Sequence, residues 1–163
     1  MSERLSLNWQ DVQFYVHEIL RQMQQAQWMP DLIMGVDRGG LPISTMISHY
    51  LTLPHESVKV SLRDIQQTES LLWAPEDVVS GYKILIVDDI NDSGATQAWL
   101  KADWASAVAG STPDFVEQFW HKSVRWASLV ENEASEESSD FVGLTINKDR
   151  KSTRLNSSHT DIS

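Results

Sequence analysis

Three carboxylates crowd one short stretch of this chain. Asp88, Asp89 and Asp92 lie in ILIVDDINDSGAT, which covers residues 84–96 and begins with four apolar residues. Such a run before charged residues is typical of a strand that is buried on both faces. Because ionised carboxylates are costly to bury without partners, we expect these side chains to face solvent, a cation or hydroxyl donors.

The residues after these carboxylates suit an anion. Ser93, Gly94, Ala95 and Thr96 stand at the start of a helical pattern. Consecutive backbone N–H groups at a helix start can cradle an anion, and a glycine lets the ligand approach closely. Carboxylates for sugar hydroxyls or a metal ion, placed beside a phosphate cradle, together indicate a phosphorylated sugar as the ligand.

Strands and helices alternate around this stretch. Apolar residues at helical spacing predict a first helix capped by Asn8. A glycine turn at 37–40 joins a short apolar run, 31–36, to a second helical pattern from 41 to 50. A third helix is expected from Gly94, and further strands are expected at 58–62, 83–89, 124–130 and 141–146. This alternation predicts a single α/β domain with a mostly parallel sheet flanked by helices, whose ligands bind beyond the carboxyl ends of the strands.

Composition narrows the class of protein. The chain has 163 residues, of which 41% are hydrophobic, so it is about one domain long. Its net charge of −10 argues against binding nucleic acid through phosphate neutralisation. It has no cysteine, which excludes disulfides and thiolate metal sites. Without a signal-like segment or a run of about 18 apolar residues, we expect a cytoplasmic protein with no membrane insertion.

The last fifteen residues indicate an origin different from that of the rest. DRKSTRLNSSH, residues 149–159, is the literal translation of a widely used sequencing adapter. We therefore expect a folded domain over 1–148 and a non-native, disordered tail over 149–163, with a different natural sequence after Lys148. Without the tail's three basic and two acidic residues, 10 basic and 21 acidic residues remain, so the domain is still acidic.

Two loops resemble those of a known family. VDDINDSGAT at 87–96 resembles the phosphoribosyl pyrophosphate (PRPP) signature of type I phosphoribosyltransferases. DRGG at 37–40 is similar to that family's pyrophosphate loop, especially in the bacterial xanthine–guanine and hypoxanthine branch. The likeness covers residues 8–146 in element order, although strong motif identity is confined to the two loops. It implies the type I phosphoribosyltransferase fold, with the C-terminal part of the base-binding hood truncated.

The resemblance also implies roles for individual residues. Asp88 and Asp89 would hold the ribose hydroxyls and help to place Mg²⁺, and Asp92 would be the general base beside a purine. Arg38 and the backbone of Gly39 would bind the leaving pyrophosphate. The 5′-phosphate would lie on Asp92, Ser93, Gly94, Ala95 and Thr96. These types suit the reaction, because loss of pyrophosphate builds positive charge on the sugar and negative charge on the leaving group.

The base site departs from the family pattern. Relatives usually place a lysine after the strand that corresponds to 124–130, where it binds the 6-oxo group, but this chain has Glu131, Asn132 and Glu133. Asn132 could donate an uncharged hydrogen bond to an oxo group. The resemblance therefore implies Mg²⁺-dependent phosphoribosyl transfer from PRPP to a nucleobase, a 6-oxopurine in purine salvage, by a homo-oligomer (dimer or tetramer).

Several alternatives accompany this interpretation. ILIVDD also opens response-regulator receiver domains, but too little chain follows here for the phospho-acceptor aspartate of a receiver. A non-catalytic PRPP-binding regulator would keep the sugar-phosphate site, although it would have no need of a base at Asp92. Asp37 and Arg38 could form a surface ion pair. We further expect a mobile lid over 63–80, a solvated acidic loop over 131–140 and mainly core or dimer roles for five tryptophans, Trp9, Trp28, Trp99, Trp104 and Trp126.

Overall fold

The computed structural model of the chain describes residues 6–60 and 73–147, which form one α/β domain. The predicted tail and most of the predicted lid lie outside the described residues. The elements run in the order α1 (Trp9–Ala26), β1 (Leu32–Asp37), α2 (Leu41–Leu51), β2 (His55–Lys59), α3 (Trp73–Val79), β3 (Ile84–Asn91), α4 (Ala95–Ala107), α5 (Phe115–Phe119), β4 (Val124–Asn132) and β5 (Phe141–Ile146). The alternation predicted from the sequence is confirmed.

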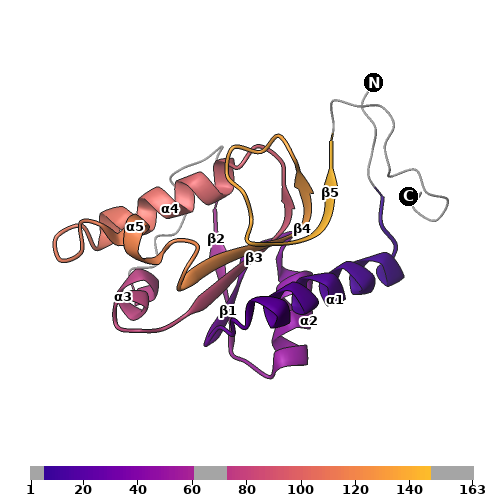
Figure 1. Cartoon of the computed structure of the whole chain (residues 1–163), viewed down its shortest axis with the longest axis horizontal. Helices are drawn as coiled ribbons and strands as arrows, with labels where there is room; N and C mark the ends of the chain where they lie inside the picture. The colour runs from indigo at the N-terminus through magenta and orange to yellow at the C-terminus, as the bar shows by residue number, and fades with distance from the viewer. Residues whose placement is uncertain (1–5, 61–72, 148–163) are drawn as a thin grey trace.

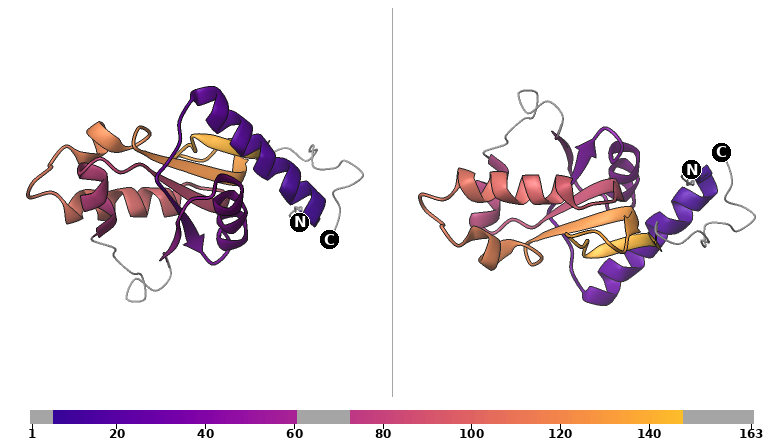
Figure 2. Two further views of the ribbon diagram at one scale, coloured as in Figure 1. Left: turned by 90° about the horizontal axis from the view of Figure 1, so that it is seen from below. Right: turned by 90° about the horizontal axis from the view of Figure 1, so that it is seen from above.

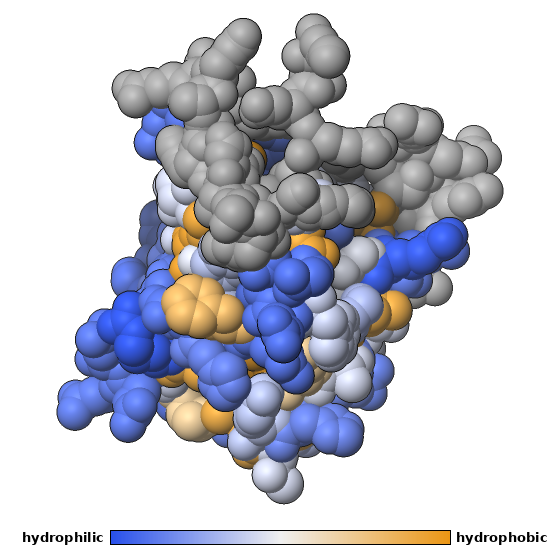
Figure 3. Space-filling view, turned by 90° about the vertical axis from the view of Figure 1, so that its right-hand side faces the viewer, coloured by the Kyte–Doolittle hydropathy of each residue, from blue (hydrophilic) through white to orange (hydrophobic). Residues whose placement is uncertain are grey.

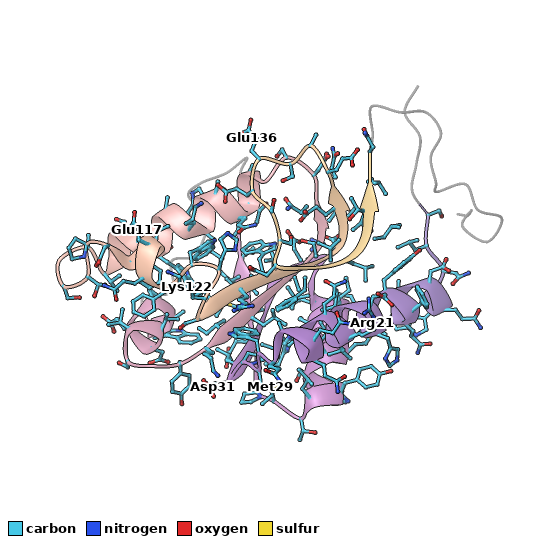
Figure 4. All side chains as sticks on the ribbon, viewed as in Figure 1. Arg21, Met29, Asp31, Glu117, Lys122 and Glu136 are labelled. Atoms are coloured by element: carbon cyan, nitrogen blue, oxygen red, sulfur yellow. The ribbon has the colours of Figure 1, made fainter. Side chains whose placement is uncertain are left out.

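The five described strands form one sheet in the order β2-β1-β3-β4-β5 (Figure 1). Every pairing between neighbouring strands is parallel, so the carboxyl ends of all five meet at one edge. Figure 4 marks the two edges: Asp31, just before β1, lies at one end of the sheet, and Glu136, after β4, lies at the other. The mostly parallel sheet expected from the sequence is confirmed.

Helices cover both faces of this sheet (Figure 2). Ile84 and Ile86 of β3 belong to a buried cluster with residues of α3, α4 and α5, whereas Leu85 and Val87 belong to a second cluster with residues of α1 and α2. Neighbouring residues of a strand point to opposite faces, so all four apolar residues of this run are buried. The prediction of a strand buried on both faces is confirmed.

The start of α1 is the one predicted from the sequence. Asn8 caps the helix: its side chain accepts a 2.8 Å hydrogen bond from the backbone N–H of Asp11, whose carboxylate in turn accepts from the N–H of Asn8. Gln22 joins α1 to β5 through hydrogen bonds to the backbone N–H and C=O of Val142, at 2.9 Å and 2.8 Å. The contact of Gln22 with Val142 fixes α1 against β5, the edge strand of the sheet.

Two predicted boundaries were wrong. The strand expected at 58–62 is β2, which ends at Lys59, because that residue pairs with Asp37 at the end of β1 and the ladder has no further partner. The segment 73–79, predicted as part of a lid, is helix α3. Its Ala74, Pro75 and Val78 are buried, and a proline is tolerated in the first turn of a helix.

The tryptophans divide between core and surface. Trp28, Trp104 and Trp126 are buried, as expected for core residues, and Trp99 is half-buried. Trp9 is 58% exposed at the start of α1, where the alternative role in a dimer contact stays a prediction. On the face at the right of Figure 1, separate hydrophobic residues lie among hydrophilic ones (Figure 3). No helix in the described part of the chain is long and apolar enough to cross a membrane.

Candidate active site

The candidate site lies where the strand order reverses. From β1 the chain moves outward to β2 on one side, and it then returns to β3 on the other side of β1. Ligands of open parallel sheets bind at such switch points, beyond the carboxyl ends of the strands. The β1–β3 ladder ends at Gly35 and Val87, so Asp88 and Asp89 come directly after the last residue of β3 that pairs with β1, while β3 continues beside β4 to Asn91.

The turn after β1 packs against the carboxyl-terminal part of β3. A Cβ atom built on Gly39 would lie 2.2 Å from Oδ2 of Asp89, and one on Gly40 would lie 2.4 Å from the carbonyl oxygen of Val87. The peptide bond between Asp37 and Arg38 is cis. A Cβ at Gly40 would clash with backbone, so only glycine fits there, whereas one at Gly39 would have to displace the side chain of Asp89. The two loops singled out in the sequence are therefore in direct contact.

The aspartate pair is unequally exposed. Asp88 is buried, at 8% exposure, whereas Asp89 is half-buried. Oδ1 of Asp88 accepts a 2.8 Å hydrogen bond from the backbone N–H of Asp89, and Oδ1 of Asp89 accepts one of 2.8 Å from the N–H of Ile90. Burial, followed by the hydrogen bond and the charge of Asp89, raises the pKa of Asp88 to about 8. Without a cation the pair therefore resists carrying two negative charges.

The loop over residues 92–96, called the phosphate loop after the ligand expected from the sequence, leads from β3 into α4. Gly94 has φ +91°, a conformation that L side chains rarely adopt, and it is the N-cap residue of α4. The hydroxyl of Ser93 accepts a 3.2 Å hydrogen bond from the backbone N–H of Ala95. Ser93 and Ala95 are exposed and Thr96 is half-buried. The loop thus presents the N-terminus of a 13-residue helix, with accessible polar groups, as the sequence predicted.

Asp92 and Asn132 meet across two neighbouring strands. The side-chain amide of Asn132, at the end of β4, donates a 3.0 Å hydrogen bond to Oδ1 of Asp92. The side-chain oxygen of Asn132 accepts a 3.1 Å hydrogen bond from the backbone N–H of Ala134. The residues expected to act on the base are therefore adjacent, on the same edge of the sheet as the aspartate pair.

Sequence comparison assigns the family. The family model described as phosphoribosyl transferase domain matches residues 7–101, more than half of the chain. The chain belongs to this family. It is a phosphoribosyltransferase, as the two loops indicated, and the receiver-domain alternative is wrong. Comparison with the curated protein sequences gives no significant match.

Solved structures show the same fold for this phosphoribosyltransferase. A purine phosphoribosyltransferase from Pyrococcus horikoshii is 22% identical, with a TM-score of 0.64 and 87% of each chain covered. A xanthine-guanine-hypoxanthine phosphoribosyltransferase from Helicobacter pylori is 20% identical, with a TM-score of 0.62 over 85% of this chain and 84% of its own. A hypothetical protein from Neisseria gonorrhoeae with bound ppGpp is 18% identical, with a TM-score of 0.65 over 90% and 85%.

Around the site of this phosphoribosyltransferase, the acidic segment was predicted correctly only in part. Residues 131–140 were expected to form a solvated loop: Glu131 and Asn132 instead end β4, whereas 133–140 is a partly exposed loop that touches the phosphate loop through residues 135–137. The backbone N–H of Glu136, which Figure 4 labels, donates a 3.1 Å hydrogen bond to the carbonyl of Ser93. Lys101 of α4 pairs with Glu137 at 2.8 Å. These partners hold a segment whose composition alone suggests solvent exposure.

Asn91 was missed by the sequence analysis of the site. It ends β3 with 5% exposure, and its amide donates hydrogen bonds to Glu131 and to the segment that follows β4. The available signal was a single amide residue between the aspartate pair and the phosphate loop. A side-chain amide buried at the end of a strand needs hydrogen-bond partners from another segment of the chain, so its position predicts a contact between the two segments.

The cationic residues are placed as follows. Arg38 is exposed on the turn after β1, and within the described residues no ion pair joins it to Asp37, contrary to the surface-pair alternative. His121 and Lys122 precede β4, lie at the opposite edge of the sheet and are exposed. His121 contacts Asp140 at 3.0 Å, and Lys122 donates to the carbonyl of Glu117 at 2.8 Å (Figure 4). Of these three cationic residues, Arg38 is the one that belongs to the turn whose Gly39 touches Asp89.

Proposed function

We propose that this phosphoribosyltransferase transfers the phosphoribosyl group of PRPP to a 6-oxopurine, with Mg²⁺ bound, and releases pyrophosphate. The contact between Gly39 and Asp89 carries the proposal. It brings the turn that would bind pyrophosphate against the carboxylates that would bind ribose. The phosphate loop begins three residues after Asp89, so one PRPP molecule could reach all three groups.

In the proposed reaction, the bond between C1 of the ribose and the pyrophosphate oxygen breaks, and a bond from C1 to a purine nitrogen forms. The pyrophosphate leaves with the electron pair, beside Arg38 and the backbone of Gly39. Positive charge that develops on the sugar is stabilised by the carboxylates of Asp88 and Asp89. The purine N–H proton passes to Asp92, which is exposed and accepts a hydrogen bond from Asn132.

Asp88 and Asp89 are the residues that would hold Mg²⁺. Because burial beside Asp89 raises the pKa of Asp88 to about 8, a bound cation would keep this carboxylate ionised at neutral pH, and carboxylate oxygens are the ligands that Mg²⁺ prefers. Within residues 6–60 and 73–147, no group of three or more acidic or histidine side chains could form a cage for a metal ion. This suits an ion held by one or two carboxylates together with substrate phosphates. When bound, Mg²⁺ would neutralise charge on the departing pyrophosphate.

A 6-oxopurine is the proposed base. The pairing of Asp92 with Asn132 supports it, because a carboxylate can accept the ring N–H proton while a neighbouring amide with a remaining N–H can donate to an oxo group. The names of the Pyrococcus horikoshii and Helicobacter pylori structures, which are purine and xanthine-guanine-hypoxanthine phosphoribosyltransferases, are consistent with this choice.

Pyrophosphate release decides between transfer and regulation. The protein is mixed with PRPP, Mg²⁺ and one candidate base at a time: hypoxanthine, guanine, xanthine, adenine, uracil or orotate. We expect release with a 6-oxopurine, none when the base is omitted and none when EDTA is present. Tight PRPP binding without release in the presence of any base would instead support a non-catalytic regulator.

We also propose that the enzyme acts in the cytoplasm as a homo-oligomer, a dimer or a tetramer. Large apolar side chains on α1 and α2 support self-association, since Trp9, Phe14 and Tyr50 are 58%, 59% and 50% exposed. Light scattering coupled to gel filtration measures the mass in solution. A mass of 18.5 kDa at micromolar concentration would contradict the oligomer.

A further inference from the structure

Asn91 makes an unusually complete set of contacts for a single buried amide. Its Nδ2 donates to Oε1 of Glu131 at 2.9 Å and to the carbonyl of Glu137 at 2.7 Å, and Oγ of Ser139 lies at 3.5 Å. Its Oδ1 accepts a 3.0 Å hydrogen bond from Oγ of Ser135. All of these partners lie at the end of β4 or in the β4–β5 connection, residues 133–140. Asn91 therefore fixes this connection from its buried side.

The β4–β5 connection in turn lies directly on the phosphate loop. A Cβ atom on Gly94 would meet the backbone nitrogen of Glu137 at 2.6 Å, and the carbonyl of Ser93 accepts from the N–H of Glu136. Lys101 holds the carboxylate of Glu137 with distances of 2.8 Å and 3.0 Å. The connection thus fills the space beside Gly94 and binds a main-chain group of the loop.

An anion site built from backbone N–H groups depends on the dihedral angles of its loop. Here the loop includes Gly94 at φ +91°, a residue that is free to adopt other conformations when nothing packs against it. The β4–β5 connection supplies that packing, and Asn91 holds the connection. A change at Asn91 should therefore reach the phosphate loop without altering any group that touches a ligand.

We propose that Asn91 is a positioning residue for the 5′-phosphate site, acting through the β4–β5 connection. This inference rests on the proposed function, because it takes residues 92–96 to be the site of the 5′-phosphate. Asn91 does not contact the substrate in this arrangement. Its role is to keep the phosphate loop in the conformation that binds, while the turn around Arg38 is held by other contacts.

The test separates the two ends of PRPP. Ribose 5-phosphate probes the phosphate loop, and pyrophosphate with Mg²⁺ probes the turn at Arg38; the affinity for each is measured by calorimetry. Asn91→Leu keeps the approximate size of the side chain and removes all of the side-chain hydrogen bonds of Asn91. We expect it to weaken ribose 5-phosphate binding about tenfold or more, because several hydrogen bonds are lost together. Pyrophosphate affinity should change less than about twofold, within the scatter of independent sites.

Two further variants provide a control and an independent check. Gln22→Leu removes another amide that bridges two elements, α1 and β5, far from the phosphate loop, and it should leave both affinities unchanged. Ser135→Ala removes the bond to Oδ1 of Asn91 from the side of the connection, together with the hydroxyl's hydrogen bonds to the carbonyl and the N–H of Glu137. It should weaken ribose 5-phosphate binding in the same direction by a smaller factor, and it decides the matter if Asn91→Leu does not fold.

The outcomes are distinguishable. Unchanged ribose 5-phosphate affinity in both Asn91→Leu and Ser135→Ala, with wild-type protein active on PRPP, would overturn the inference alone. Equal weakening of ribose 5-phosphate and pyrophosphate would show that Asn91 supports the fold in general and would also overturn it. Wild-type protein that binds neither PRPP nor ribose 5-phosphate would instead refute the proposed function, and this inference with it.

Discussion

Gly39 lies directly against the carboxylate of Asp89, although the two residues are fifty positions apart. An ideal Cβ on Gly39 would be 2.2 Å from Oδ2 and 2.6 Å from Cγ of Asp89. Real Cβ atoms essentially never approach this closely. The turn after β1 and the acidic end of β3 therefore share one surface, and a side chain at Gly39 must displace the carboxylate.

Gly39→Ala is expected to weaken Mg²⁺-dependent PRPP binding by about tenfold or more, the effect of losing one charge-assisted contact. The methyl group displaces the carboxylate of Asp89, while the core on either face of the sheet is untouched, so the melting temperature should change little. Calorimetry with PRPP and thermal unfolding measure the two effects. Gly110→Ala is the control, because nothing lies within 4 Å of a Cβ at Gly110. PRPP affinity equal to wild type in Gly39→Ala would contradict the proposed placement.

Asp88→Asn combined with Asp89→Asn should abolish Mg²⁺-dependent PRPP binding while the fold stays intact. Both substitutions preserve shape, and the buried Asp88 has a raised pKa, so its neutral form already fits the site. Circular dichroism checks the fold, and calorimetry checks binding. If the double variant binds PRPP with wild-type affinity in the presence of Mg²⁺, these carboxylates do not form the ribose and metal site.

The raised pKa of Asp88 predicts how stability varies with pH. Between pH 3.8, the ordinary pKa of an aspartate, and about pH 8, the folded protein holds a proton on Asp88 that the unfolded chain releases. The free energy of unfolding from this group therefore falls as pH rises through that window, because the folded state binds more protons than the unfolded state. Below pH 3.8 both states are protonated, so the free energy of unfolding from this group no longer changes with pH and stays at its highest value.

Asp88→Asn should remove this loss of stability. In EDTA and without PRPP, we expect the melting temperature of wild type to fall relative to that of Asp88→Asn between pH 5 and pH 9. Asp114→Asn changes an exposed carboxylate far from the site and should track wild type across the same range. Parallel melting curves for wild type and Asp88→Asn would show that Asp88 ionises normally in the folded protein.

Asp92→Asn should separate binding from turnover. The asparagine can still pair with Asn132, so PRPP affinity should be preserved, but it cannot accept the purine proton. Turnover is expected to fall about 10²-fold or more, the usual contribution of general acid–base catalysis. Steady-state rates with the active base and PRPP titrations measure the two quantities. Equal losses of binding and rate would assign Asp92 a structural role.

The sequence by itself determined the features that depend on neighbouring residues. The Asn8 cap joins residues three apart, and the apolar run of β3 sets which strand is buried on both faces. The phosphate loop depends on Gly94 at the start of α4. Each of these is an interaction within one turn or one strand, so its residues stand together in the chain and its pattern is visible there. The α/β class and the two ligand loops could be predicted for this reason.

Only the tertiary structure decided which distant groups meet. The contact of Gly39 with Asp89 follows from β1 and β3 being neighbours, and the partners of Asn91 lie 40 or more positions away on β4 and beyond. The end of β2 was set by the end of its partner β1. Strand order and register arise from packing both faces of the whole sheet at once, and no local pattern encodes them. The contacts of the acidic segment after β4 could not be predicted for the same reason, because its donors come from α4 and from Asn91.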